Sequence, residues 1–182
     1  EAAALPEVLA ERAAALGQRA LALVDADGVY GAPRFYRACT RLGITPLVGA
    51  EISMRDGGRL PLLIEDREGY RNLCRLLTRI KMRAAKGEGA AGWEDLEEHV
   101  GGVVCLTGGP QGPVAHRLER DGHEAARATL DRLTGLFGRF NVFAELQRDL
   151  NRESEAQNEW LRAEAGYRKL ALLASNAPVM AE

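Results

Sequence analysis

The chain has 182 residues, of which 46% are hydrophobic and 27% charged, and its formal net charge at pH 7 is −2. This length accommodates one large domain or two small ones, with enough hydrophobic residues for a substantial core. The nearly balanced charge gives no overall electrostatic attraction to nucleic acid or membranes. No apolar run reaches the roughly 18 residues of a membrane span. Three widely spaced cysteines, Cys39, Cys74 and Cys105, indicate reduced thiols in a cytoplasmic protein.

The first half of the chain alternates between helical and strand patterns. Apolar residues at helical spacing predict helices over 5–16, 33–42 and 67–83. Short continuous apolar runs predict strands over 20–24, 44–52 and 60–64. The turn residues Asp56, Gly57 and Gly58 fold the last of these strands back as a hairpin, and Asp66 is placed to cap the long third helix.

The second half continues the alternation after an exposed loop over 84–92. Apolar patterns predict helices over 93–99, 113–120, 123–136 and 153–164, and strands over 103–106, 140–146 and 170–174. The glycine-rich stretch 107–113 lacks the lysine of a phosphate-binding P-loop, so we interpret it as a strand-to-helix connection. Strands and helices in alternation imply a parallel sheet covered by helices, either as a barrel or as an open doubly wound sheet.

Two acids, Asp25 and Asp27, follow the first apolar strand, at the place where α/β proteins bind metals and phosphates. The stretch 25–29 resembles the first motif of haloacid-dehalogenase-type phosphatases, which implies Asp25 as nucleophile and Asp27 as general acid beside Mg²⁺. The residues after the last strand, 175–178, contain no acidic pair to hold that metal. The alternative is that Asp27 and Gly28 cap a turn, with one of the acids in an ion pair.

The three histidines do not favour a metal centre. A multinuclear hydrolase needs several imidazoles at the carboxyl ends of strands, and none of His99, His116 and His123 follows a predicted strand. We therefore interpret all three as surface residues.

A row of arginines at strict four-residue spacing occupies the helix predicted over 67–83. Its members are Arg67, Arg71, Arg75, Arg79 and Arg83. Glu68 is the only acid between Arg67 and Lys86, so the spacing predicts a positive stripe on one helix face. The stripe either contacts nucleic acid phosphates or an acidic neighbouring domain, or it is a solvated face paired with acids elsewhere, such as Glu94, Glu97 and Glu98.

Several stretches together resemble the PHP (polymerase and histidinol phosphatase) domain family. The stretch 20–32 resembles the second motif of the family, and 46–51 resembles the strand that carries its glutamate ligand. The run EGYRNLCRL at 68–76 makes the match specific to bacterial C-family DNA polymerases of the replicative α-subunit type. The hairpin at 55–59 and the turn at 86–88 are most similar to the error-prone branch of these polymerases.

The resemblance implies an α/β fold, a distorted (βα)7 barrel of the PHP type at the N-terminus of a polymerase. It covers nearly all of 1–182, which we expect to form a single domain and to be a piece of a much longer chain. The first strand of the family carries a His-x-His motif that would lie just before Glu1, so we expect a barrel without its first strand. Active members of the family hold a cluster of metals on histidines and carboxylates and cleave phosphoesters.

Carried over position by position, the resemblance implies an incomplete metal site. Positions where the family has ligands hold other residues here: Ala26, Arg59, Gly109, Ala177 and Val179. Glu51 matches the glutamate ligand, with Asp25 nearby, and such a vestigial pair without imidazoles binds a divalent metal only weakly. We expect no metal and no catalytic residue in this domain, with Arg59 paired to Glu51 instead.

The resemblance therefore predicts a catalytically degenerate scaffold within an error-prone DNA polymerase, a nucleotidyltransferase of translesion or repair-type DNA replication. Expected partners are the other domains of the same polymerase, and DNA through the parent chain, without a membrane. No cofactor is expected in this domain, while the palm of the parent polymerase is expected to hold Mg²⁺. One alternative is a metal-dependent phosphoesterase in which the missing strand completes a site with Asp25, Asp27 and Glu51. A second is a haloacid-dehalogenase-like phosphatase that uses Asp25.

Overall fold

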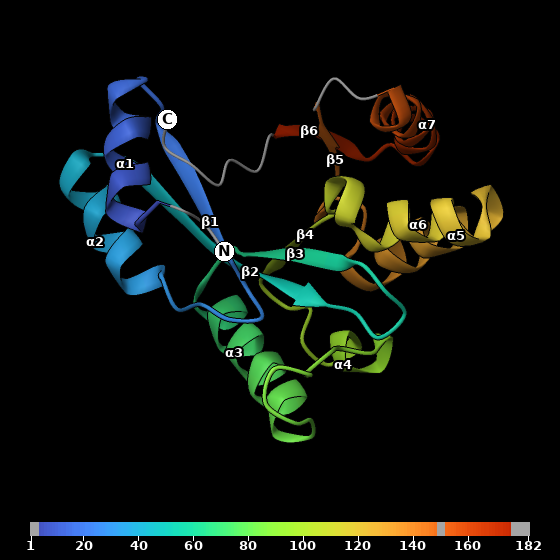
Figure 1. Cartoon of the computed structure of the whole chain (residues 1–182), viewed down its shortest axis with the longest axis horizontal. Coiled ribbons are helices and arrows are strands. Elements are labelled where there is room, and N and C mark those ends of the chain that lie inside the picture. The colour runs from blue at the N-terminus through green and yellow to red at the C-terminus, as the bar shows by residue number, and fades with distance from the viewer. Residues whose placement is uncertain (1–3, 149–151, 176–182) are drawn as a thin grey trace.

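The computed structural model describes residues 4–148 and 152–175, which form a mixed α/β fold (Figure 1). In chain order the elements are α1 (Pro6–Ala15), β1 (Ala20–Ala26), α2 (Ala32–Leu42), β2 (Thr45–Ser53), β3 (Arg59–Ile64), α3 (Arg67–Met82), α4 (Trp93–Glu97), β4 (Val103–Leu106), the short 3₁₀ helix η1 (Gly109–Gln111), α5 (Pro113–Asp121), α6 (His123–Phe137), β5 (Val142–Gln147), α7 (Arg152–Arg168) and β6 (Ala171–Ser175). Every predicted helix and strand is present. The boundaries differ by a few residues, and β1 extends beyond its predicted end to include Asp25 and Ala26.

Six strands of the described residues form one sheet in the order β1-β2-β3-β4-β5-β6. β1 is parallel to β2, and β4, β5 and β6 run parallel to one another, but β3 is antiparallel to both of its neighbours. The hairpin expected at 56–58 is confirmed, because β3 folds back antiparallel to β2, and the remaining neighbours β1/β2, β4/β5 and β5/β6 pair in parallel as the alternation of strands and helices predicts. The sheet curls into a half-barrel with β1 and β6 at its edges (Figure 1), which agrees with the expected PHP-type barrel without its first strand.

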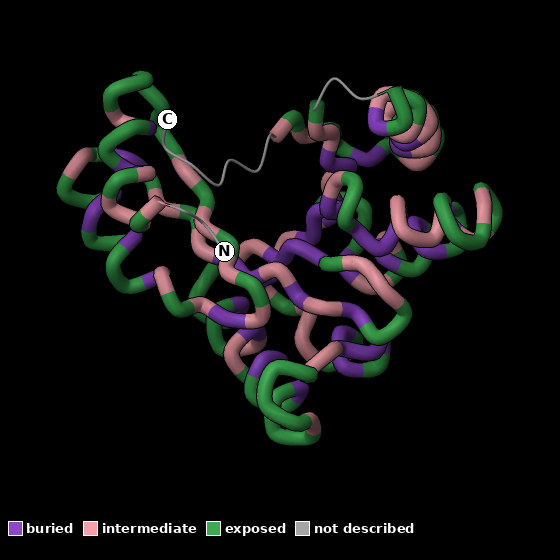
Figure 2. Tube along the Cα trace, viewed as in Figure 1, coloured by how far each residue is buried: buried purple, intermediate pink, exposed green. Residues whose placement is uncertain are grey.

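Two hydrophobic clusters hold helices against the sheet. The larger joins the central strands to α3, α4, α5, α6 and α7, and the smaller joins α1 and α2 to β1 and β2 around Phe35 and Cys39. Figure 2 shows the buried residues concentrated in the middle of the sheet and on the helix sides that face it, while β1 and β6 are largely exposed or half-buried. The central strands and their helices therefore supply most of the hydrophobic stabilisation.

The long helix α3 begins and packs as its sequence predicts. Asp66 caps its N-terminus, because a carboxylate oxygen of Asp66 accepts a hydrogen bond from the backbone N–H of Gly69 at 2.8 Å. The apolar side of α3 is buried against β3 and β4 through Leu73, Leu76, Leu77 and Ile80. Within the described ranges, no helix is both long and apolar enough to cross a bilayer.

Candidate functional site

The two acids after β1 already have protein partners. Asp25 accepts a hydrogen bond at Oδ2 from the backbone N–H of Gly31, at 2.7 Å. Asp27 accepts one at Oδ1 from the backbone N–H of Ser53 and one at Oδ2 from its hydroxyl, both at 2.8 Å. Asp27 also adopts a left-handed backbone with φ 47°, which aspartate tolerates better than most residues. Asp25, and not Asp27 as expected, therefore accepts the hydrogen bond that closes the turn at 26–31, while Asp27 links the end of β1 to β2. Neither acid has an ion pair with another described residue.

The strand register places the two vestigial carboxylates on opposite faces of the sheet. Across the parallel pair β1/β2, Asp25 lies beside Ala50, and Ala26 lies beside Glu51. Because successive residues of a strand point to opposite faces, Glu51 shares its face with Ala26 and not with Asp25. The two carboxylates therefore do not converge on one site, whereas a histidine in place of Ala26 would lie next to Glu51.

The expected ion pair between Glu51 and Arg59 is present. Nη1 of Arg59, at the start of β3, lies 3.3 Å from Oε2 of Glu51 in β2, and both side chains are partly exposed. An ion pair at this exposure contributes about 1 kcal/mol or less to stability. Its main consequence is chemical, because a guanidinium now neutralises the carboxylate that matches the family's ligand.

A third position of the expected ligand set is filled by a neighbouring side chain. Gly109 lies in η1 after β4, and a Cβ atom built on it would approach Cδ of Gln147 to 2.5 Å. Gln147 in turn donates a hydrogen bond from Nε2 to Oε1 of Glu145 at 3.1 Å. A larger side chain at 109 would require the flexible end of Gln147 to shift. The remaining positions, Ala177 and Val179, lie outside the described residues.

The structure adds one acid that the sequence analysis did not single out. Glu145 in β5 is 5% exposed, and its Oε1 accepts hydrogen bonds from Gln147 and from the hydroxyl of Ser175. Its Oε2 has no partner among the residues that the structure describes. The available signal was that Glu145 is the single charged residue of the predicted strand 140–146. A buried carboxylate oxygen without a partner lowers stability.

Replacing Glu145 with glutamine should therefore stabilise the fold by about 1 kcal/mol, because the amide removes a buried charge and keeps an acceptor for Gln147 and Ser175. Urea unfolding followed by circular dichroism measures the change. Replacing Glu145 with alanine is the matched control, and it should destabilise the fold because it deletes the whole buried side chain. A lower stability of the glutamine variant would contradict this account of Oε2.

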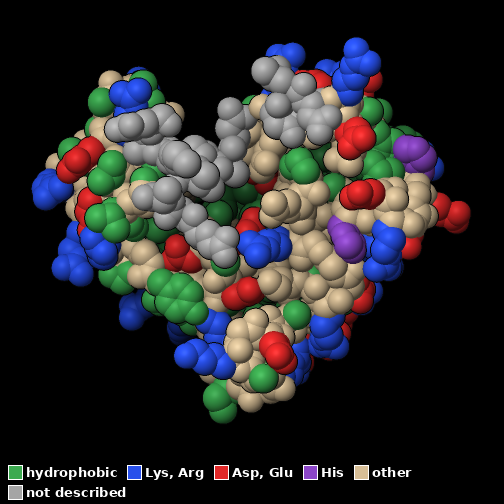
Figure 3. Space-filling model, viewed as in Figure 1, with side chains coloured by type: hydrophobic (Ala, Val, Ile, Leu, Met, Phe, Trp, Pro, Cys, Tyr) green, Lys and Arg blue, Asp and Glu red, His purple; other side chains and the backbone are tan. Residues whose placement is uncertain are grey.

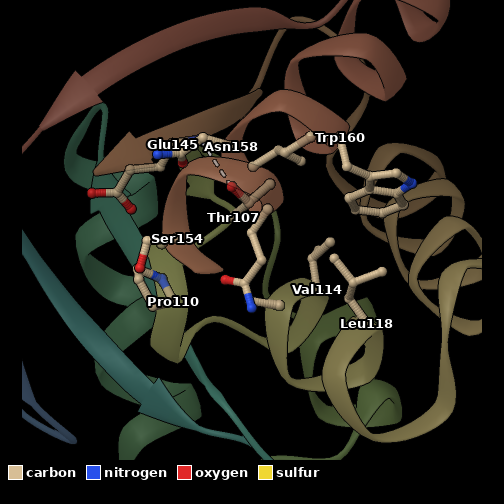
Figure 4. A pocket seen from close by; sticks show the side chains of 12 residues that line it. Thr107, Pro110, Val114, Leu118, Glu145, Ser154, Asn158 and Trp160 are labelled. Carbon is tan, nitrogen blue, oxygen red and sulfur yellow. Dashed lines mark hydrogen bonds between the residues drawn. The ribbon is translucent and has the colours of Figure 1, made fainter. Parts of the chain in front are cut away.

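A small pocket opens beside Glu145, at the carboxyl ends of β4 and β5. Figure 4 shows Val114, Leu118 and Trp160 along one side of it, while the carboxylate of Glu145 points away from them. Thr107 closes the pocket at the sheet, where its hydroxyl accepts a hydrogen bond from the backbone N–H of Glu145 at 2.8 Å. Of the described residues, Glu145 is the one acid that lines this pocket, and neither Glu51 nor Arg59 lines it.

Among the residues the structure describes, no three or more histidine, cysteine, aspartate or glutamate side chains are grouped to hold a metal ion. The histidines are dispersed over different helices. His99 lies against the carbonyl of Asp95, His116 packs on the turn at Gly57, and His123 lies near Trp160. The interpretation as surface residues is correct for His123, which is exposed, whereas His99 and His116 are half-buried.

The arginine row of α3 divides into two parts. Arg79 contacts Glu98 and lies 3.3 Å from Asp95, and Arg83 donates hydrogen bonds to both carboxylate oxygens of Asp95. The first three members are exposed and have no ion pair or hydrogen bond within the described ranges: Arg67, Arg71 and Arg75. A four-residue row rotates by about 40° per step around a helix of 3.6 residues per turn. Over the four steps of the whole row this rotation adds up to about 160°. Pairing with acids of the segment 94–98 is found for two members, Arg79 and Arg83.

Asp95 is the centre of this pairing and was missed by the sequence analysis. Its side chain is fully buried, and its Oδ2 accepts a hydrogen bond from the backbone N–H of Gly92 at 2.8 Å and lies 3.2 Å from Nη2 of Arg55. The hydrogen bonds from Arg83 hold the pKa of Asp95 at about 2, below its ordinary 3.8. Asp95 thus ties α3 and α4 to the hairpin between β2 and β3. Its position three residues after Gly92, at a helix start, was the available signal.

The half-barrel covered by helices is the fold that the sequence resemblance predicts. The family model for the PHP domain matches residues 1–149. The chain therefore belongs to the PHP domain family. This membership leaves the haloacid-dehalogenase resemblance confined to the short stretch 25–29.

The sequence relatives are far longer than this chain. An error-prone DNA polymerase from Pseudomonas fluorescens is 43% identical over 98 residues, one from Anaeromyxobacter sp. (strain K) is 40% identical over 147, and one from Mycobacterium tuberculosis is 37% identical over 156. These alignments cover 54%, 76% and 79% of this chain but only 10%, 12% and 14% of the relatives. The chain thus corresponds to a small part of the polymerases that it resembles.

Two solved structures share the fold. One is a protein from Bifidobacterium adolescentis, described as a candidate metal-dependent phosphoesterase, which superimposes with a TM-score of 0.62 at 15% identity. The superposition covers 98% of this chain and 84% of the Bifidobacterium chain. An amidohydrolase from Chromobacterium violaceum, with bound sulfate and no metal, gives a TM-score of 0.62 at 16% identity, covering 97% and 83%. At these identities the likeness concerns the fold alone.

Proposed function

We propose that this chain is the PHP domain of an error-prone DNA polymerase and that the domain is a scaffold without hydrolytic activity of its own. The observation that carries the first part is the 37–43% identity to error-prone DNA polymerases, of which the chain spans a small share. In this proposal the parent chain extends primers in repair-type or translesion replication, with Mg²⁺ held in its palm. The domain contacts DNA and the other domains as part of that chain.

The scaffold role is supported by the state of the would-be metal site. The described residues do not fit a multinuclear centre: Glu51 is paired with Arg59, Asp25 lies on the other face of the sheet, and the space at Gly109 is filled by Gln147. Guanidinium groups repel the cations that such a centre holds. We therefore derive no hydrolytic step from this site. Its residues instead hold β1, β2 and β3 together at the end of the half-barrel.

Phosphodiester hydrolysis and primer extension by the intact polymerase chain test this proposal. We expect extension of a primed template with Mg²⁺, and no hydrolysis of bis-p-nitrophenyl phosphate with Mn²⁺ or Zn²⁺. Elemental analysis of the purified chain should find no stoichiometric transition metal in this domain.

The variant Glu51→Ala separates the scaffold from the metal-dependent phosphoesterase alternative. If the unsubstituted chain hydrolysed the phosphodiester and Glu51→Ala abolished that activity, the scaffold proposal would be wrong. The phosphatase alternative that uses Asp25 predicts instead that Asp25→Asn abolishes hydrolysis of a phosphomonoester, with Glu51→Ala active. A chain that does not extend primers would overturn the polymerase assignment. The scaffold role would then be decided by the hydrolysis assay and the elemental analysis.

A further inference from the structure

Three consecutive members of the arginine row form a separate surface, which we call the α3 arginine face: Arg67, Arg71 and Arg75. Over these two steps the row turns by only about 80° around α3, so the three side chains project to one side of the helix. Successive members are separated by about 6 Å along the helix axis. α3 lies at the lower end of the molecule beside α4 and away from α7 (Figure 1), so neither α7 nor β6 covers it.

No guanidinium of the α3 arginine face has an ion pair within the described residues, although three acids, Glu65, Asp66 and Glu68, flank Arg67 in the chain. Basic and acidic side chains are interspersed over the face of the molecule seen in Figure 3. Most arginines in the described ranges follow this pattern, for example Arg34 with Glu7, and Arg127 with Glu164. Like charges four residues apart on a helix repel each other and lower the stability of the fold. This cost is offset when an anion binds the three guanidiniums.

We propose that the α3 arginine face binds the phosphate backbone of DNA, an inference that rests on the proposed polymerase function. Each guanidinium can donate two parallel N–H groups to one phosphate, and a row of them follows a chain of phosphates. Lys81 and Lys86 add positive charge at the C-terminal end of α3. The face thus matches a polyanion with repeated, closely spaced charges.

The composition of the face favours DNA phosphates over bases or a protein partner. Tyr70 is the one aromatic residue of α3, so the helix offers no series of rings on which successive bases stack. Tyr70 and Met82 are the large apolar side chains that α3 exposes, and they lie 12 positions apart, whereas a protein interface needs an apolar centre. Contacts to phosphates alone are independent of base sequence and weaken strongly with salt.

The salt dependence of DNA binding tests the inference in the intact polymerase chain. We expect the triple variant Arg67→Gln, Arg71→Gln, Arg75→Gln to reduce the slope of log affinity against log salt by about 3 for duplex DNA. Its affinity at low salt should fall by about tenfold or more. Fluorescence anisotropy with labelled duplex, between about 50 and 200 mM salt, gives both quantities. The single variant Arg71→Gln should reduce the slope by about 1.

The matched control removes the same charge elsewhere. Arg12, Arg19 and Arg162 are also exposed and have no ion pair within the described residues, so their triple replacement by glutamine should leave the slope unchanged. An equal change in both triple variants would overturn the inference, because it would reflect net charge and not this surface.

Photo-crosslinking identifies what lies on the α3 arginine face. A photo-reactive amino acid in place of Arg71 should form an adduct with DNA, and one in place of Arg162 should not. An adduct with an acidic protein segment alone would overturn the inference in favour of a domain contact. Primer extension by the unsubstituted chain tests the polymerase assignment separately. If the chain does not extend primers but the triple variant still reduces the salt slope, only the proposed function is contradicted.

Discussion

Replacing Asp95 with asparagine should lower the free energy of unfolding by about 3 kcal/mol. Asp95 is fully buried, and it receives hydrogen bonds from Arg83 and Gly92 and lies close to Arg55 and Arg79. An amide carries no charge to hold the three arginines and places a donor where acceptors are needed. The loss is limited because these guanidiniums are half-exposed and regain water.

Urea unfolding at neutral pH measures the effect, with Glu98→Gln as the control. Glu98 also contacts an arginine of α3, but it is exposed, so its replacement should change stability by less than about 0.5 kcal/mol. Similar losses of stability in both variants would show that the burial of Asp95 does not increase its contribution to the free energy of unfolding.

The same carboxylate should make the fold sensitive to acid. Because the pKa of Asp95 is lowered from 3.8 to about 2 in the folded state, its contribution is complete above about pH 4 and is lost as the pH falls toward 2. The contribution lost in this window is about 1–2 kcal/mol after screening by solvent around the arginines. The stability difference between the unsubstituted chain and Asp95→Asn should therefore shrink between pH 4 and pH 2, and a constant difference would contradict the assigned cause.

The sequence predicted the elements well because their signals are local. The apolar spacing of α3, its cap at Asp66 and the hairpin turn all lie within a few residues of one another, and each is present. The Glu51–Arg59 pair was expected on a different ground, because the family resemblance places both residues at positions of one metal site.

What sequence reasoning missed depends on residues far apart in the chain. Arg55 and Asp95 are 40 positions apart, and Ser175 and Glu145 are 30 apart, so only the tertiary fold shows that they meet. The rotation of the arginine row around α3 was computable from helix geometry alone. Which arginines form ion pairs depends on where α4 packs against α3. The arginine spacing contains no information about the position of α4.

Replacing Gly69 with alanine should destabilise the fold by about 3 kcal/mol, although alanine favours a helix more than glycine does. A Cβ atom on Gly69 would lie 1.7 Å from the carbonyl oxygen of Gly102, in the turn that leads into β4. That carbonyl cannot easily move, because it accepts a hydrogen bond from the backbone N–H of Glu65 at 2.9 Å. The first turn of α3 would have to separate from the sheet.

Gly135→Ala is the matched control for this prediction. Gly135 is exposed within α6, and a Cβ atom there would have no neighbour within 4 Å, so alanine should raise stability by about 0.5–1 kcal/mol. Opposite signs for the two glycines, measured by urea unfolding, would separate close packing from helix propensity. Equal signs would contradict the close approach of α3 to 101–102. Gly69 belongs to the run EGYRNLCRL at 68–76, so this contact gives one residue of the family's sequence signature a physical reason that involves no catalysis.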